Sequence, residues 1–344
     1  MGVMNKPVIA GTLDNIKERG FLKCGVNTGL LGFSIKNDNG RWEGFDVEFC
    51  RALAVAIFND PEKVEYRGLN GSERFKVLSD GEVDILYRNT TWTLTRDSAM
   101  GITFAGVNYY DGQGYMVKSD AGINSAYELS GLRLCTEEGT TGVTNSIDFF
   151  NFNNMKYEIV SYETSAGVRD GFQQGECDVI SNDQSALYSQ RLNLEDPSSV
   201  VILPELISKE PLGPSVKRGD DEWFDIAHWV LNMMIEAEFL DINSVNAVSL
   251  RESGSMEQKR LLALGHLPVV ETDEKPEETL TAELGTHEID LNLEAGWAYR
   301  VITQIGNYGE VFKRTIGAQS ELQIARGLNA QWNNGGILYS QSFR

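Results

Sequence analysis

The stretch RNTTWTLTRD, residues 88–97, concentrates side chains that could bind a small anion. It combines threonine hydroxyls with arginine guanidinium groups and follows directly on the apolar run VDILY. A guanidinium group can hold a carboxylate through two parallel hydrogen bonds, while neighbouring hydroxyls and amides donate to its remaining lone pairs. We therefore expect Arg96 to be a candidate carboxylate ligand at the end of a buried strand. The residues alone also allow a surface ion pair between Arg96 and Asp97 or Asp84.

A second candidate anion site lies in the segment EEGTTGV, residues 137–143. The amides of Thr140 and Thr141 are predicted to lie at a strand-to-helix turn, where N–H groups and the helix dipole point outward. The segment lacks the Lys-Ser/Thr ending that a phosphate-binding loop requires, so it does not indicate a nucleotide site. An ordinary glycine turn is the alternative interpretation.

Composition limits the partners that such sites could have. The chain has 344 residues, of which 41% are hydrophobic and 10% aromatic, enough for two domain-sized cores. Lys and Arg number 30 against 50 for Asp and Glu, and the net charge of −20 should repel nucleic acid and anionic lipid. A small molecule is therefore the expected partner.

The sequence predicts no metal site and no cofactor. Its cysteines and histidines show neither a CxxC motif nor metal-ligand spacing. The four cysteines, Cys24, Cys50, Cys135 and Cys177, could form two disulfides or remain buried thiols. No apolar run is long enough to span a bilayer, and the start MGVMNKPVIAG lacks the order of a signal peptide, so we expect a form from which the signal is absent.

The order of predicted elements indicates two α/β lobes. In the first half, strands are predicted at 21–26, 63–69 and 84–89, with helices at 44–58 and 72–83 between them. A similar alternation runs from residue 131 to the segment SNDQSALYS, residues 181–189. Alternating strands and helices favour mostly parallel sheets, whose ligands bind beyond the strand C-termini. Two such lobes imply a cleft between them.

The segment Gly44 to Ile57, G-F-D-V-E-F-x3-L-A-x2-I, resembles the signature helix of the periplasmic amino-acid-binding proteins that serve ABC importers. The phrases CGVNTGLLGFS, FAGVNYYDGQGYMV, ILPELISKEPLGP and ARGLNAQW resemble more narrowly the general L-amino-acid-binding subfamily. The resemblance implies a type II periplasmic-binding-protein, or venus-flytrap, fold. It also implies a periplasmic monomer that closes on one free L-amino acid and delivers it to an inner-membrane permease.

The resemblance and the chain pattern together predict the domain limits. Residues 1–117 and 212–268 should form lobe 1, and 118–211 lobe 2, with hinge crossings at 116–120 and 208–214. An acidic linker is expected at 269–288, where the run ETDEKPEETLTAE has no apolar periodicity. Residues 289–344 should form a helical C-terminal extension that packs on a lobe, with one amphipathic helix over 294–306 and a second from Ser320 to Trp332.

The resemblance also implies the roles of individual residues. Arg96 would hold the α-carboxylate, and Asp183 would accept from the α-ammonium, although an Asp there could instead cap the following helix. Thr93 would brace the loop. The other implied ligand residues are Asn27, Leu30, Phe33, Asn89, Thr91, Glu137, Thr140, Thr141 and Asn182. Phe33 could equally be plain core.

Glu137 carries two further expectations. A carboxylate facing the ligand side chain should disfavour acidic ligands, unless Glu137 turns outward to solvent. An alternative function, a cyclohexadienyl dehydratase-like enzyme on the same fold, would use Glu137 as a general acid. The receptor is preferred because the sequence shows no nucleophile–base pair, metal cluster or cofactor loop.

The predicted elements also suggest how the cysteines pair. Cys24 lies on the first strand of lobe 1 and Cys50 on the helix that should pack over that sheet. Cys135 and Cys177 lie on two strands of lobe 2. Pairs within each lobe are the hypothesis, since a bridge between lobes would block a hinge.

Overall fold

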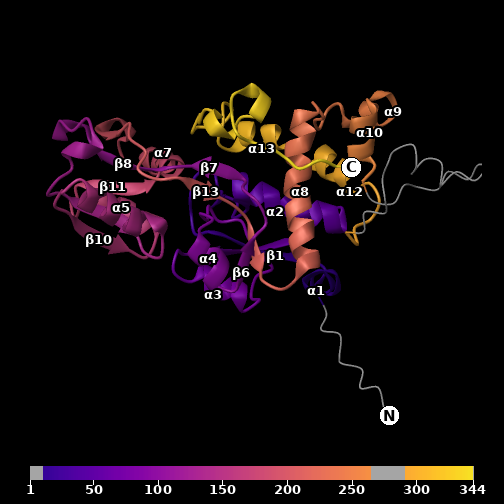
Figure 1. The fold of residues 1–344 in the computed structure, drawn as a ribbon, viewed down its shortest axis with the longest axis horizontal. Helices are drawn as coiled ribbons and strands as arrows, with labels where there is room; N and C mark the ends of the chain where they lie inside the picture. Colours follow the sequence, from indigo (N-terminus) through magenta and orange to yellow (C-terminus); the bar gives the residue numbers. More distant parts are fainter. Residues whose placement is uncertain (1–10, 265–290, 344) are drawn as a thin grey trace, which may run out of the picture.

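The computed structural model describes residues 11–264 and 291–343, which form two α/β lobes and a C-terminal extension (Figure 1). The predicted acidic linker at 269–288 lies outside the described residues. None of the helices within the described part is long and apolar enough to cross a membrane.

Lobe 1 is built on a five-stranded sheet of order β4-β1-β5-β14-β6. Its strands are β1 (Leu22–Asn27), β4 (Val64–Leu69), β5 (Ile85–Leu86), β6 (Ile102–Phe104) and β14 (Ser215–Lys217). Its helices are α1 (Thr12–Arg19), α2 (Phe45–Phe58), α3 (Arg74–Ser79) and α4 (Leu94–Ala99), and a short hairpin joins β2 (Ile35–Lys36) to β3 (Trp42–Glu43). The central strand β1 pairs in parallel with β4 and β5, so the loops that follow these strands meet at one edge.

The helix α2 is almost entirely buried, which fits its mostly apolar sequence. It begins after Gly44, and Asp46 and Glu48 in its first turn complement the helix dipole. It ends at Asn59, which adopts the left-handed conformation and donates its N–H to the Val55 carbonyl. The predicted helix at 44–58 is confirmed.

Lobe 2 repeats this architecture with the strand order β10-β9-β11-β8-β12. Its strands are β8 (Gln113–Lys118), β9 (Arg133–Glu137), β10 (Glu158–Tyr162), β11 (Val179–Asp183) and β12 (Val200–Ile202). Its helices are α5 (Thr141–Phe152), α6 (Ser165–Gln173) and α7 (Gln184–Leu192), with 3-10 turns η1 (Ser119–Ala121), η2 (Ala126–Glu128) and η3 (Pro197–Ser199). The strands β9, β10 and β11 are parallel, whereas β8 and β12 run antiparallel to their neighbours.

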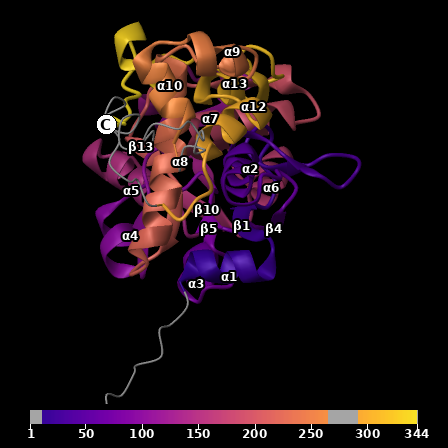
Figure 2. The ribbon, with the colours of Figure 1, turned by 90° about the vertical axis from the view of Figure 1, so that its right-hand side faces the viewer.

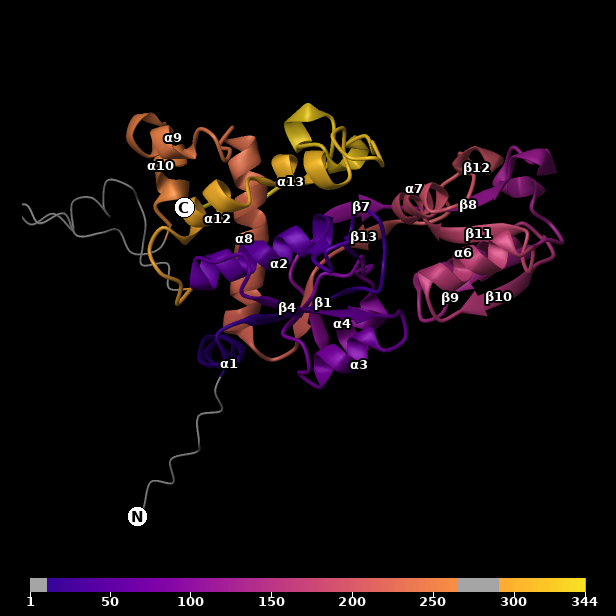
Figure 3. The same cartoon turned by 180° about the vertical axis from the view of Figure 1, so that it is seen from behind.

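Two adjacent antiparallel strands, β7 (Tyr109–Asp111) and β13 (Glu210–Leu212), connect the lobes (Figures 1 and 3). The second crossing lies within the predicted range 208–214. The first does not, because Met116 is in the middle of β8 and pairs with both β11 and β12 inside the lobe 2 sheet. The predicted boundary at 117/118 was therefore wrong: lobe 2 begins at β8. An antiparallel strand inserted from lobe 1 is not visible in a pattern of alternating strands and helices.

The long helix α8 (Asp221–Phe239) follows β14 and packs on lobe 1 against α2. Around one end of it gather α9 (Ala247–Ser253), α10 (Met256–Leu262), α12 (Trp297–Gln304) and α13 (Tyr308–Thr315), as Figure 2 shows. The predicted helix over 294–306 corresponds to α12, whose Trp297, Val301 and Ile302 are buried in the lobe 1 core.

The predicted helix from Ser320 to Trp332 was wrong. This segment contains only the 3-10 turns η4 (Gly327–Asn329) and η5 (Trp332–Asn334), and Gln323 and Gly327 have positive φ angles. Contacts to distant elements hold this segment in an extended conformation. Arg326 forms a bidentate ion pair with Glu238 of α8, at 2.8 and 3.0 Å. These long-range contacts outweigh the local helical preference of the sequence.

The Asn329 side chain joins the extension to the inter-lobe connection. Its Oδ1 accepts from the Tyr110 N–H at 2.7 Å, and its Nδ2 donates to the Tyr110 carbonyl at 3.0 Å. These two bonds pair both the N–H and the carbonyl of one β7 residue, as a neighbouring strand would. The C-terminal extension therefore contacts the crossing strand directly.

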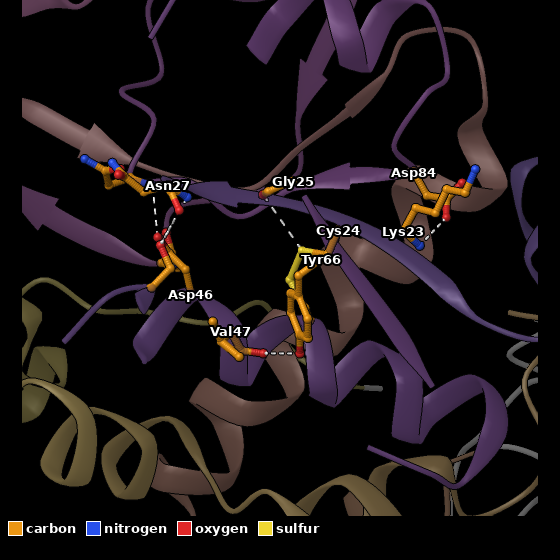
Figure 4. Close-up of a disulfide and its surroundings, with 12 residues drawn as sticks. Lys23, Cys24, Gly25, Asn27, Asp46, Val47, Tyr66 and Asp84 are labelled. Carbon is orange, nitrogen blue, oxygen red and sulfur yellow. Dashed lines mark hydrogen bonds between the residues drawn. A yellow bond between two sulfur atoms is a disulfide. The ribbon is translucent and has the colours of Figure 1, made fainter. Parts of the chain in front are cut away.

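Each lobe contains one disulfide. Cys24 of β1 is bonded to Cys50 of α2, with Cα atoms 6.3 Å apart, and Figure 4 shows this bond beside Tyr66. Cys135 of β9 is bonded to Cys177, which precedes β11, with Cα atoms 5.7 Å apart. These are the two within-lobe pairs that the sequence suggested, and neither restricts the connection between the lobes.

Candidate functional site

A small, largely polar cavity lies where the loops after the strands of both lobes meet. Its volume is about 20 Å³, which is room for roughly one water molecule. Its lining comprises Asn27, Leu30, Arg74, Arg88, Asn89, Thr91, Arg96, Glu137, Thr140, Thr141, Gly142, Ser165, Asn182, Asp183 and Ala186. All the residues that the resemblance implied as ligands therefore line the cavity except Phe33.

Arg96 is placed by the first turn of α4. Thr93 caps this helix, its hydroxyl accepting from the Arg96 N–H at 3.2 Å. The guanidinium is buried, and its Nη1 donates to the Thr91 carbonyl at 2.9 Å. Burial, partly offset by Glu210 and Asp183, lowers the pKa of Arg96 to about 10, so the group is cationic at neutral pH.

The alternative surface ion pair for Arg96 does not form. The Asp97 carboxylate instead accepts from the Phe104 N–H at 3.2 Å. Asp84 pairs with Arg19 on the other side of the lobe. Within the described residues Arg96 has no carboxylate in salt-bridge contact; its Nη2 donates to the Gly139 carbonyl of lobe 2 at 3.4 Å, and the residue lines the cavity.

Asp183 ends β11 on the opposite lobe and occupies the N-cap position of α7. Its side chain makes no capping hydrogen bond, so helix capping does not account for it. Burial, together with the nearby charges of Asp111 and Glu210, raises the pKa of Asp183 well above its ordinary value. A cation placed beside this carboxylate would relieve that unfavourable burial.

The N-terminus of α5 completes the lobe 2 side. Thr140 and Thr141 begin this helix, and the Thr141 hydroxyl lies 3.4 Å from the hydroxyl of Thr91 on lobe 1. Thr141 also donates to Glu210 at 3.0 Å, which links the helix to the crossing strand β13. Free N–H groups at a helix start favour an anion.

On the lobe 1 side, Asn27 and Asn89 are held by a short polar network. The Asn27 Nδ2 donates to Asn89 Oδ1 at 3.0 Å, and the Asn89 N–H donates to Asp46 at 3.0 Å. Figure 4 shows Asp46 beside the end of β1 that carries Asn27. Asn89 has a φ of 35°, a left-handed conformation that redirects the chain after β5.

Phe33 lies in the core and not in the cavity. Its side chain is 1% exposed and makes edge contacts with Phe45 and Tyr109, at ring distances of 5.9 and 5.6 Å. Phe33 is therefore not among the residues that line the cavity, although the resemblance implied it as a ligand residue. The second interpretation, plain core, describes its position.

Glu137 forms a buried ion pair with Arg88, whose Nη2 lies 2.6 Å from the Glu137 Oε1. Arg88 follows β5 in lobe 1 and Glu137 ends β9 in lobe 2, so the pair connects the two lobes. The Glu137 charge is thus already compensated. The expected discrimination against acidic ligands loses its physical basis.

The sequence analysis missed two cavity-lining arginines, Arg74 and Arg88. Arg88 opens the polar stretch 88–97 at the end of the predicted strand 84–89, a signal that was available. Arg74 lies at the start of α3, close behind the predicted strand at 63–69. Burial, then the charges of Arg88 and Arg96, lowers the pKa of Arg74.

The lobes approach each other through two glycines. A Cβ built on Gly71 of lobe 1 would overlap the Glu138 carbonyl oxygen of lobe 2. A Cβ on Gly139 would lie 2.7 Å from backbone atoms of Gly71. The absence of side chains at these two positions therefore permits the close approach.

Because carboxyl groups are buried near the site, we expect the free energy of unfolding to fall as the pH rises. Burial is the main cause that raises the pKa of Asp46 from 3.8 to about 7 and that of Asp111 from 3.8 to about 6. Between pH 4 and 7 the folded chain then binds more protons than the unfolded chain, so the free energy of unfolding decreases with pH. Urea titrations without amino acids should show lower stability at pH 7.5 than at pH 5, by a few kcal/mol.

Asp46→Asn, which cannot titrate, should reduce this pH difference and serves as the control. Equal stability of the unmodified protein at both pH values would contradict the raised pKa values of these buried carboxyl groups.

Within residues 11–264 and 291–343, no cluster of three or more His, Cys, Asp or Glu side chains could hold a metal ion.

The chain is similar in sequence to one protein-family model and to individual amino-acid-binding proteins. The family model for bacterial extracellular solute-binding proteins, family 3, matches residues 22–243. The general L-amino acid-binding periplasmic protein AapJ of Rhizobium johnstonii is 48% identical over 335 residues, covering 97% of this chain and 93% of that protein. The glutamate/glutamine/aspartate/asparagine-binding protein BztA of Rhodobacter capsulatus is 44% identical, covering 97% of this chain and 94% of that protein.

A solved structure extends this similarity to three dimensions. A periplasmic binding protein of an ABC transporter from Brucella ovis, with glutathione bound, has 48% sequence identity and a TM-score of 0.88. The match covers 98% of this chain and the whole of that one. The C-terminal extension, which lies beyond the matched family region, is therefore included in this similarity.

Proposed function

This chain belongs to the bacterial extracellular solute-binding proteins of family 3, and we propose that it captures a free L-amino acid between its lobes for an ABC importer. It would release the amino acid to the permease in the inner membrane. The names of its relatives support a periplasmic location, and the two disulfides agree with an oxidising compartment. The protein would act as a monomer.

The observation that carries the proposal is the pair of buried, opposite charges on the two lobes. Arg96 and Asp183 both line the cavity, and neither forms an ion pair with another described residue. A free amino acid carries a carboxylate and an ammonium group on one carbon. Arg96 would bind the carboxylate together with Thr91 and the start of α5, while Asp183 and the Asn89 carbonyl would accept from the ammonium.

Binding would be coupled to a movement of the lobes. A cavity of about 20 Å³ cannot admit an amino acid unless the lobes separate or the lining side chains move. The strands β7 and β13 are the described connections, so rotation about them would open the cleft and leave both sheets intact. The ion pair between Arg88 and Glu137 would break on opening and form again on closure.

The enzyme alternative receives no support from the site. Its proposed acid, Glu137, is engaged in the buried ion pair with Arg88, whose Nη2 donates to Glu137 Oε1 at 2.6 Å. Close relatives over nearly the whole chain are named as binding proteins. These observations favour a receptor.

Calorimetry with the L-amino acids, using D-isomers as controls, tests the proposal. Protein freed of carried-over ligand by unfolding and refolding should bind L-isomers at a ratio of one to one. The bound form should also melt higher, with a stabilisation of about 2.7 kcal/mol at a ligand concentration of 100 Kd. Turnover of prephenate or arogenate in a parallel assay, or no binding of any amino acid, would contradict it.

A further inference from the structure

The first turn of α7 is capped by the crossing strand β7 and not by its own N-cap residue. Asp183 occupies the N-cap position, from which an aspartate side chain ordinarily accepts from an N–H two or three residues on, yet it makes no such bond. The N–H of Ser185 donates instead to Asp111 Oδ2 at 3.3 Å. The N–H of Gln184 donates to the Gly112 carbonyl at 2.8 Å. The end of β7 and the residue after it therefore satisfy two of the N–H groups that begin the helix.

Asp111 is part of the connection between the lobes. It is the last residue of β7 and lies opposite Glu210 of β13. Its other oxygen, Oδ1, accepts from the Gly112 N–H at 2.8 Å, so both carboxylate oxygens have a backbone donor. The preceding residue, Tyr110, is bonded on both its N–H and its carbonyl to the Asn329 side chain. The Asp111 carboxylate is therefore held in place beside the start of α7.

The Asp183 carboxylate lies among charges of both signs. Burial has the largest effect in raising its pKa, the charges of Asp111 and Glu210 raise it further, and those of Arg96 and Arg74 oppose the rise. The carboxylate makes no capping bond and lines the cavity. It is therefore available to a cationic group of a ligand.

Two roles could compete for this carboxylate. An unpaired N–H at a helix start, together with the helix dipole, attracts a carboxylate in the N-cap position. If Asp183 were drawn into a bond with the Ser185 N–H, the helix and not the ligand would set its orientation. Because Asp111 already accepts from this N–H, the competition does not arise.

We propose that Asp111 is a positioning residue for ligand binding, which caps α7 in place of Asp183 and so leaves the Asp183 carboxylate facing the cavity. The inference rests on the proposed function in one respect, that Asp183 accepts from the ammonium group of an amino acid. Both Asp111 and Gly112 bond to α7, so the cap should persist when the lobes separate. The ammonium site would then be formed before the ligand arrives.

The test measures discrimination between L-glutamate and L-2-hydroxyglutarate, which differ in carrying an ammonium or a hydroxyl group on the α-carbon. In Asp111→Ala the Ser185 N–H loses its acceptor, and Asp183 should turn to cap the helix. A side-chain cap changes the local equilibrium by a factor of about 2 to 30, so the affinity for L-glutamate should fall by about this factor. The affinity for the hydroxy acid should fall less, so the ratio of the two affinities decreases.

Asp111→Asn separates the cap from the charge. Asparagine caps helices as well as aspartate does, so this variant should keep a ratio close to that of the unmodified protein. A decrease equal to that in Asp111→Ala would overturn the proposal, because the charge of Asp111 and not its bond to Ser185 would then be responsible. An unchanged ratio in Asp111→Ala would also overturn it.

Asp196→Ala is the matched control in the same lobe. Asp196 caps the turn η3 by accepting from the Ser198 N–H at 2.9 Å, and its removal should leave the ratio unchanged. A decrease in this control as large as that in Asp111→Ala would overturn the proposal, since the loss of any cap in lobe 2 would then have the same effect.

A crystal structure of ligand-free Asp111→Ala gives a second readout. The Asp183 carboxylate should accept from the Ser185 N–H, and a carboxylate that lines the cavity without this bond would overturn the proposal. This result needs no ligand, so it is distinct from failure of the proposed function, in which no amino acid binds the unmodified protein. Circular dichroism and melting curves check folding, and Asp111→Leu, which also lacks an acceptor, replaces Asp111→Ala if that variant does not fold.

Discussion

Arg96→Ala should weaken the binding of every amino acid, by about 30-fold to several thousand-fold. The guanidinium is buried, fixed by Thr91 and Thr93, and has no ion-pair partner within the described part of the chain. Its removal would leave the α-carboxylate of the ligand desolvated and unpaired, a loss of about 2 to 5 kcal/mol. Because all amino acids share this group, the loss should depend little on the side chain.

Calorimetry on Arg96→Ala with a neutral and an acidic amino acid measures this effect. Arg41→Ala is a suitable control, since Arg41 pairs with Glu62 on the surface, where both side chains are 61% exposed. The control should bind like the unmodified protein. Unchanged affinity of Arg96→Ala for either ligand would mean that the threonine–arginine loop does not bind the carboxylate.

Gly71→Val should prevent full closure of the lobes and weaken binding by roughly 5- to 150-fold. A side chain at this position would overlap the Glu138 carbonyl oxygen of the opposite lobe, and a backbone atom cannot move aside as a flexible side chain can. Overpacking of this kind costs about 1 to 3 kcal/mol in the closed form. The open form would not be affected, because the lobes are apart there.

Small-angle scattering at saturating amino acid distinguishes Gly71→Val from the unmodified protein, which should become more compact. Gly29→Val provides the control in the same lobe, because a Cβ on Gly29 would meet no atom within 4 Å. This control should close and bind normally. Compaction of Gly71→Val equal to that of the control would contradict the role of the glycine contact.

The fold was predictable from the sequence because its local signals are strong. The buried helix α2 has an apolar sequence with acidic residues in its first turn, and the alternation of strands and helices was visible in both lobes. The membership and the two-lobe fold that followed from the resemblance are confirmed by the family match and the similar structure. The crossing strands were located less well, since β8 belongs by hydrogen bonding to lobe 2.

Contacts between distant residues could not be predicted in the same way. The sequence shows an aromatic residue at position 33 but not the Phe45 and Tyr109 rings that enclose it. Likewise, the ion pair that engages Glu137 depends on Arg88 from the other lobe. The segment after Ser320 has residues suitable for a helix, yet its bonds to β7 and α8 hold it extended.

The most direct test of the account is a calorimetric titration with the tightest-binding L-amino acid and with its N-acetyl derivative. The derivative keeps the carboxylate and the side chain but removes the charge that Asp183 should pair with. The account predicts binding of one free amino acid per protein and a loss of about 30-fold or more for the acetylated form. Equal affinity for the two compounds would contradict the claim that opposite lobes hold the two charges of one amino acid.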